Sequence, residues 1–300
     1  MKKIFIVIFL VIISVGSAVT YKIVITEPTE TEKLKITTSF YPLAEFARQV
    51  GGKNVEVINI TPPGSEPHDY EPTPQDIVHV NSSEIFIFNG SSFDPWAEKI
   101  APKLEEEGIK VLRMTEYFDL IGTDDGSDPH IWLNPILAKQ EVEIIRDTLQ
   151  KIDPTNSSMY NDNAQQYLGK LSELDQKFRT GLASCELREA IVSHAAFGYL
   201  AERYDIDIIS IAGISPEEEP SLRRLGEIAK LAQEKNINYI FFETLISPKL
   251  AETIAQEIGA ETLVLNPVEG LTDEEIESGK SYISEMEKNL SNLQRALVCT

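Results

Sequence analysis

Three of the four histidines in this 300-residue chain stand in loops. His68 lies in the proline-rich stretch TPPGSEPHDYEPTPQD, His130 lies in the turn-rich stretch GTDDGSDPHIWLNP, and His194 ends the strand-like stretch EAIVSH. Open α/β sheets bind their ligands in loops beyond the carboxyl ends of strands. Neutral imidazole is a common metal ligand, so this placement predicts a metal site. The fourth histidine, His79, lies on the predicted short helix PTPQDIVHV, and we expect it to be structural or to face solvent.

A carboxylate is expected to complete this set of ligands. Two residues of the second half qualify: Glu243, which ends the strand-like stretch INYIFFE, and Glu269, in the irregular loop LVLNPVEGLT. Three imidazoles and one carboxylate form a four-coordinate set that suits Zn²⁺, with metal–nitrogen distances of about 2.0 to 2.1 Å. A set dominated by oxygen would instead favour Mn²⁺, Mg²⁺ or Ca²⁺.

Other interpretations of the same residues remain open. His68 could stabilise a turn, His130 could hydrogen-bond to Asp128, and His194 could cap the helix that follows it. A zinc hydrolase would use the three histidines as ligands and Glu269 as general base, although the chain lacks the H-E-x-x-H pattern. A metal-storage protein or a metal-binding adhesin would share every one of these features.

The order of the predicted elements explains how such loops could meet. From Leu34 onward, strand-like and helix-like segments alternate in both halves of the chain, which predicts an α/β fold with mostly parallel sheets. We expect two lobes, residues 34–152 and 185–300, joined by one long rigid helix within residues 153–184. The apolar residues of that helix recur at three- and four-residue spacing. A last helix is expected from about Thr272 to Leu297.

Charge and the N-terminus restrict the class of protein. The net charge of −21, from 48 acidic and 27 basic residues, argues against nucleic-acid binding. Residues 1–23 have the pattern of a signal peptide or an N-terminal membrane anchor, followed by a polar linker at 24–33. In an oxidising compartment Cys185 and Cys299 could form a disulfide. Five N-x-S/T sequons fit an exported, glycosylated protein.

Several stretches resemble the metal-specific solute-binding proteins of zinc and manganese ABC importers. They are FYPLAEFARQVGG, PGSEPHDYEPTPQDI, DPHIWLNP, SHAAFGYLAERY and NPVEGLT. The resemblance extends from Lys35 to the last helix, and it implies two α/β lobes bridged by a single helix with one metal ion in the cleft between them. Its ligands would be His68 and His130 from the first lobe and His194 and Glu269 from the second. Glu243 would support the site without binding the metal.

The resemblance also implies a function and a metal. Manganese-type members usually have Glu in the position of His194 and Asp in that of Glu269, so the histidine favours Zn²⁺ over Mn²⁺ as the cargo. The histidine-rich loop of many zinc-type members is replaced by the short acidic stretch GTDDGSD. We expect a monomer without catalytic activity that captures Zn²⁺ with high affinity. It would work outside the cytoplasmic membrane, in the periplasm or at the cell surface, and deliver the ion to a permease with its ATPase. Affinity should fall as the pH drops toward about 6.5, because histidine must lose its proton to bind metal.

Overall fold

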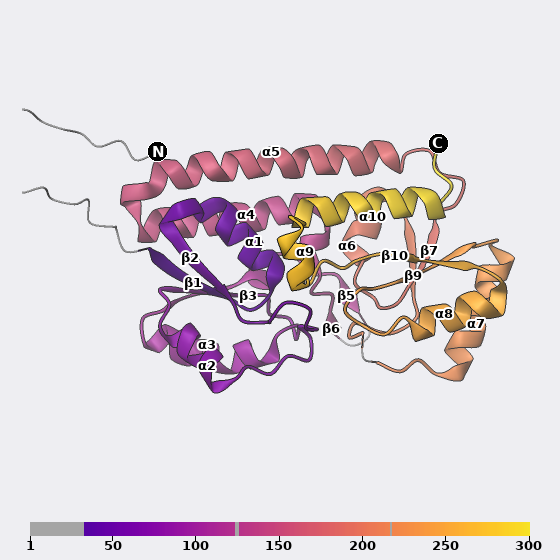
Figure 1. Ribbon diagram of the computed structural model, residues 1–300, viewed down its shortest axis with the longest axis horizontal. Helices are drawn as coiled ribbons and strands as arrows, with labels where there is room; N and C mark the ends of the chain where they lie inside the picture. The colour runs from indigo at the N-terminus through magenta and orange to yellow at the C-terminus, as the bar shows by residue number, and fades with distance from the viewer. Residues whose placement is uncertain (1–32, 124–125, 217) are drawn as a thin grey trace, which may run out of the picture. The chain divides into compact units, whose positions relative to one another are not determined.

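Two four-stranded parallel sheets form the framework of the protein (Figure 1). The structure is a computed structural model and describes residues 33–123, 126–216 and 218–300. The first sheet contains β1 (Leu34–Thr38), β2 (Val55–Asn59), β3 (Ile85–Phe88) and β4 (Lys110–Arg113) in the order β2-β1-β3-β4. The second contains β7 (Glu189–Val192), β8 (Asp207–Ser210), β9 (Tyr239–Phe242) and β10 (Glu261–Val264) in the order β10-β9-β7-β8. Numbered within its own sheet, each therefore has the same strand order, 2-1-3-4.

The helices of the first half surround the first sheet (Figure 1), and each has a proline at its first or second position. Because its fixed φ suits the first helical turn and its missing N–H costs nothing there, proline favours this position. The helices are α1 (Tyr41–Gly51), α2 (Pro74–Asn81), α3 (Pro95–Glu106) and α4 (Pro135–Ile152). The 3₁₀ turns are η1 (Gly52–Asn54), η2 (Met114–Tyr117) and η3 (Ile131–Leu133), and a small antiparallel hairpin pairs β5 (Gly122–Thr123) with β6 (Gly126–Ser127).

The long helix between the two halves is α5 (Ser157–Gly181), preceded by the 3₁₀ turn η4 (Pro154–Asn156). Its 25 residues extend about 38 Å at 1.5 Å per residue. It packs against α1 and α4 of the first half and against α10 (Tyr282–Ala296) of the second (Figure 1). The predicted α/β class with two parallel sheets and one long joining helix is confirmed, whereas the lobe boundaries 34–152 and 185–300 stay a prediction.

Two expectations for the second half were wrong in detail. Its helices are α6 (Gly198–Tyr204), α7 (Leu222–Glu234), α8 (Lys249–Ile258), α9 (Asp273–Glu277) and α10. The expected helix 272–297 is thus two helices, because Gly279 has a φ of 82° and Ser281 starts a new capping box. In addition, three residues lie between His194 and α6, whose N-cap is Phe197, so His194 does not cap this helix.

The two cysteines form a disulfide between Cys185, just after α5, and Cys299, just after α10. Two of the sequon asparagines, Asn89 and Asn289, are buried, so a glycan on either side chain is incompatible with this fold. No helix among the described residues is long and apolar enough to cross a bilayer. The predicted signal or anchor at 1–23 and nearly all of the linker at 24–33 lie outside the described residues.

Candidate metal centre

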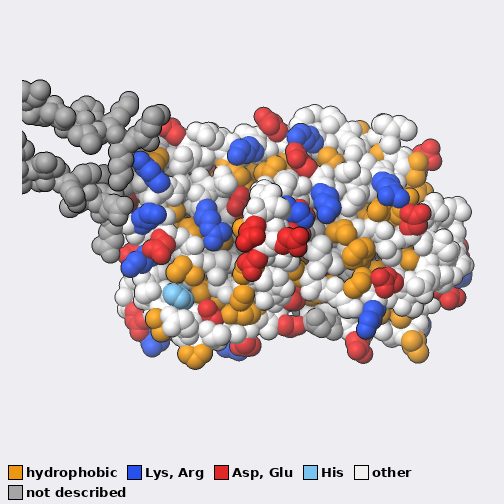
Figure 2. All heavy atoms as spheres, viewed as in Figure 1, with side chains coloured by type: hydrophobic (Ala, Val, Ile, Leu, Met, Phe, Trp, Pro, Cys, Tyr) orange, Lys and Arg blue, Asp and Glu red, His pale blue; other side chains and the backbone are white. Residues whose placement is uncertain are grey.

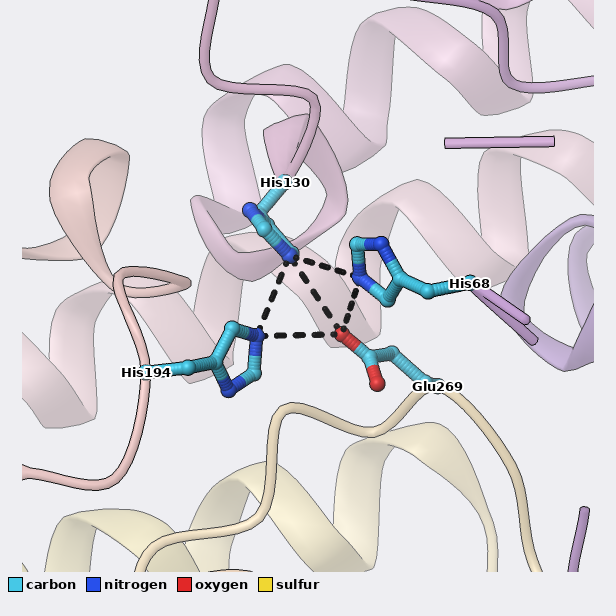
Figure 3. Close-up of side chains that lie close together, drawn as sticks. All are labelled: His68, His130, His194 and Glu269. Atoms are coloured by element: carbon cyan, nitrogen blue, oxygen red, sulfur yellow. Dashed lines mark hydrogen bonds and ion pairs between the residues drawn. The ribbon is translucent and has the colours of Figure 1, made fainter. Parts of the chain in front are cut away.

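Loops at the carboxyl ends of strands bring His68, His130, His194 and Glu269 together (Figure 3). His68 lies in the loop from β2 to α2, and His130 lies between β6 and η3. His194 follows β7, and Glu269 lies between β10 and α9. The two halves of the chain therefore contribute two of these side chains each.

The local sequence fixes the loop of His68. Thr73 caps α2 by accepting a hydrogen bond from the backbone N–H of Asp76, and the Asp76 carboxylate accepts hydrogen bonds in return from the Thr73 backbone N–H and the Tyr70 hydroxyl. This capping box begins the helix at Pro74 and ends the proline-rich loop. The loop thus keeps a defined shape although it contains no regular structure.

The four donor atoms all lie within 4.8 Å of one another, and five of the six pairs lie within 3.6 Å. The Nε2 atom of His130 is 3.3 Å from Nε2 of His68 and 3.3 Å from Nε2 of His194. Oε1 of Glu269 is 3.5, 3.4 and 3.6 Å from the Nε2 atoms of His68, His130 and His194, respectively. Ligand atoms about 2.0 to 2.1 Å from a tetrahedral Zn²⁺ are about 3.3 to 3.4 Å from one another. The side chains already have the separations that a zinc ion between them requires.

The cluster is shielded from water. His130, His194 and Glu269 have no exposed surface, and the side chain of His68 is 5% exposed. The ring of Phe93 stands edge-on to that of His68 at 4.4 Å between centroids. Both oxygens of Glu269 lack a hydrogen-bond donor among the described residues. A buried carboxylate without a donor is costly, and a cation between it and the imidazoles would remove that cost.

Two carboxylates orient the imidazole rings from the outer side. Nδ1 of His130 is 2.7 Å from Oδ1 of Asp128, and Nδ1 of His194 is 2.7 Å from Oε1 of Glu243. A carboxylate at Nδ1 holds the proton there and leaves Nε2 free to bind a metal. The hydrogen bond considered as an alternative role for His130 is therefore present, and it is compatible with metal binding. Glu243 thus lies beside His194 and is not among the four clustered donor residues.

The electrostatics of the cluster pair a negative carboxylate with the neighbouring imidazoles. Burial would raise the pKa of Glu269, but the three histidines that face its Oε1 outweigh burial and hold this pKa well below its ordinary value. Burial would likewise lower the pKa of His194, yet the nearby charge of Glu243 raises it well above the ordinary value. Burial does lower the pKa of His68. Glu269 therefore carries its negative charge in the interior.

Sequence reasoning missed one residue beside the site. The Glu66 carboxylate accepts a hydrogen bond from the backbone N–H of His68, at 3.1 Å. Burial, together with the charge of Glu269, raises the pKa of Glu66 to about 9. Its position two residues before a loop histidine was the available signal. His79, by contrast, lies on α2 outside the cluster, with its ring near Gln75.

The protein has two parallel β-sheets with flanking helices, joined by one long helix. A buried cluster of three histidines and one carboxylate is shared between its two halves. Together these features define a metal-specific solute-binding protein. Comparison with known families agrees with this class. The family described as "Zinc-uptake complex component A periplasmic", ZnuA, matches residues 36–296. The chain belongs to this family, the zinc-type solute-binding proteins of ABC importers.

Individual relatives extend over most of the chain. The high-affinity zinc uptake system protein ZnuA of Bacillus subtilis is 36% identical over 282 residues, which cover 89% of this chain and 88% of that protein. The zinc-binding lipoprotein AdcA of Streptococcus pneumoniae is also 36% identical, but the match spans only 56% of its length. The crystal structure of the Zn(II)-bound ZnuA-like domain of this AdcA has a TM-score of 0.79 and 37% identity, and the match covers 88% of this chain and 99% of the domain.

Proposed function

We propose that this protein captures Zn²⁺ with high affinity outside the cytoplasm and delivers it to the permease of an ABC importer, whose ATPase drives transport. The observation that carries the proposal is the spacing of the four donor atoms, 3.3 to 3.6 Å for the five measured pairs. Three nitrogens and one oxygen at these separations match four-coordinate zinc. We propose His68, His130, His194 and Glu269 as the ligands and Glu243 as a partner of His194.

We propose binding without catalysis. A hydrolytic zinc site keeps one position open for water. Here Glu269 stands at 3.4 to 3.6 Å from all three Nε2 atoms, as a fourth ligand does, rather than beside a space for water. The same arrangement supports Zn²⁺ over Mn²⁺, because three imidazoles form a nitrogen-rich set.

We also propose that the protein is exported and acts as a monomer, at the outer face of the cytoplasmic membrane, in the periplasm or at the cell surface. The secretory pattern of residues 1–23 supports export, as does the disulfide between Cys185 and Cys299. On the face shown in Figure 2, Lys and Arg side chains are interspersed with Asp and Glu and form no continuous basic patch. This surface fits the expectation that nucleic acid is not a partner.

Metal analysis tests the proposal. Protein purified without added metal should contain about one equivalent of zinc per chain, as expected for a single four-ligand site, and Zn²⁺ should displace Mn²⁺ in competition. His194→Ala should lower zinc affinity by more than about 100-fold, because even partners of ligands are worth 10- to 100-fold. His79→Ala is the matched control, since this histidine lies outside the cluster. Wild-type zinc affinity in His194→Ala would refute the proposed site.

A further inference from the structure

The loop that carries Glu269 contains a strained residue directly before it. Val268 has a φ of 57° and is fully buried. This left-handed conformation is a genuine outlier for a β-branched residue, because its side chain crowds the backbone there. Such a conformation persists only where the surrounding contacts impose it. The contacts around this loop should therefore explain why Glu269 points at the histidines.

Asn266 supplies the first of these contacts. Its side-chain Oδ1 accepts a hydrogen bond from the backbone N–H of Val268, at 2.8 Å. This short-range bond closes the turn in which Val268 takes its left-handed φ. The Asn266 side chain is itself 1% exposed, so the bond is shielded from water.

Asn289 of α10 supplies the second contact, because its side chain makes two hydrogen bonds with the backbone of Asn266. Its Oδ1 accepts a hydrogen bond from the Asn266 N–H at 2.8 Å, and its Nδ2 donates to the Asn266 carbonyl oxygen at 2.6 Å. Because the buried carboxamide makes both hydrogen bonds, it fixes the position of the loop backbone at Asn266 relative to α10. Asn289 is also 1% exposed.

We infer that Asn289 and Asn266 are positioning residues that hold Val268 in the left-handed conformation and thereby aim the Glu269 carboxylate at the three histidines. This inference rests on the proposed function, in which Glu269 is a zinc ligand. Without the two asparagines, Val268 would relax to a negative φ and the residue after it would turn away from the cluster. Zinc affinity therefore depends on α10, a helix that contributes no ligand.

The first test compares two asparagines of α10. Asn289→Ala should lower zinc affinity by about 10- to 100-fold, the usual effect of removing a partner of a ligand, as measured by competition with a chelator. Asn292→Ala is the matched control, because its Nδ2 also donates to a backbone carbonyl, but that of Val264 at the end of β10, at 2.7 Å. Asn292→Ala should keep the wild-type affinity. Thermal melting of the metal-free proteins identifies any variant that fails to fold.

The second test is rescue through the backbone. Glycine adopts a positive φ without strain, so Val268→Gly should restore most of the zinc affinity lost in Asn266→Ala. Val264→Gly serves as the control, because Val264 ends strand β10, where glycine relieves nothing. Cobalt substitution adds a spectroscopic readout: the visible spectrum of Co²⁺-loaded Asn266→Ala should differ from wild type, and the double variant should return toward it.

The outcomes separate the two ideas. Wild-type protein that binds no zinc would refute the proposed function itself. Wild-type protein that binds zinc, together with an Asn289→Ala variant of unchanged affinity and cobalt spectrum, would overturn the positioning role. Equal recovery of the affinity of Asn266→Ala by Val264→Gly and by Val268→Gly would also overturn the positioning role. The recovery would then not depend on the conformation of residue 268.

Discussion

The indole Nε1–H of Trp132 donates a hydrogen bond to the carbonyl oxygen of Pro267 at 2.7 Å. Trp132 lies two residues after His130, and Pro267 lies two residues before Glu269. The bond thus joins a ligand loop of the first half to a ligand loop of the second. The hydroxyl of Tyr282, on α10, donates to the Trp132 carbonyl oxygen and reinforces the junction. The separation between His130 and Glu269 is therefore set by the protein and not by a metal ion alone.

Replacing this indole should loosen the site. Trp132→Phe keeps an aromatic ring but removes the donor to Pro267. We expect zinc affinity to fall by about 10-fold, near the lower end of effects on ligand supports, and stability to fall by about 1 to 3 kcal/mol because the buried carbonyl loses its partner. Isothermal titration under chelator competition measures the first and denaturant unfolding the second. Trp96→Phe is the control, since Trp96 packs in the separate core around Phe86; equal loss of affinity in both variants would contradict the prediction.

The Glu243 carboxylate, which contacts Nδ1 of His194, should increase the zinc affinity of the proposed site. Glu243→Gln keeps the size of the side chain at 2.7 Å from Nδ1 but removes its charge. Zinc affinity should drop by about 10- to 100-fold, because without the carboxylate charge the His194 imidazole binds a metal ion less strongly through Nε2. Glu252→Gln on α8 removes the same charge from an exposed position and should leave affinity unchanged. Indistinguishable affinities in the two variants would rule out a supporting role for Glu243.

A buried carboxyl on α4 should make the fold less stable as the pH rises. Glu141 is fully buried without a hydrogen-bond donor among the described residues, and burial raises its pKa well above 4.5. Above pH 4.5 the folded state therefore holds a proton that the unfolded state has lost, so each further pH unit costs about 1.4 kcal/mol until the raised pKa is reached. Glu141→Gln should be more stable than wild type, by a margin that grows from pH 5 to pH 7, in urea unfolding. Glu143→Gln, two residues along the helix and only partly buried, is the matched control.

The disulfide should stabilise the fold without affecting the metal. Cys185 and Cys299 are 114 residues apart in sequence, and closing a loop of this length restricts the unfolded chain by an amount worth about 2 to 5 kcal/mol. The double variant Cys185→Ser/Cys299→Ser should melt at a lower temperature and keep its zinc affinity. Reductant should lower the melting temperature of wild type and leave that of the variant unchanged. A large loss of zinc affinity would mean that the bridge also shapes the site.

The meeting of the three loop histidines could be predicted because its signals are local. Each of the loop histidines stands next to prolines, glycines or a strand end, and parallel strands bring such loops to one edge. The partners of the ligands were less visible. Asp128 precedes His130 by two residues, and a hydrogen bond between them was considered as an alternative role for the histidine. Glu66 precedes His68 by the same spacing and was missed. Proximity in sequence shows that two residues can meet but not which atoms do.

Features that depend on contacts between residues far apart in the chain could not be predicted from the sequence. The left-handed Val268 results from bonds to Asn266 and from Asn289 on α10, and valine itself gives no hint of a positive φ. The break near Gly279 was overlooked because the apolar spacing continues across it. The Trp132–Pro267 bond links residues 135 positions apart. For Val268 and Trp132, tertiary contacts decide a conformation that local preference leaves open, whereas the glycine and the capping box at the break were local signals that were missed.

The packing of α5 against helices of both halves has a thermodynamic consequence. Each half alone offers a bidentate chelator, His68 with His130 or His194 with Glu269, and such pairs bind zinc weakly. Because α5 contacts α1 and α4 on one side and α10 on the other, an ion held by one pair meets the second at a high effective concentration. Much of the proposed zinc affinity would thus be a chelate effect that depends on α5, a helix that contributes no donor atom, and it would be lost if the chain were cut into its two halves.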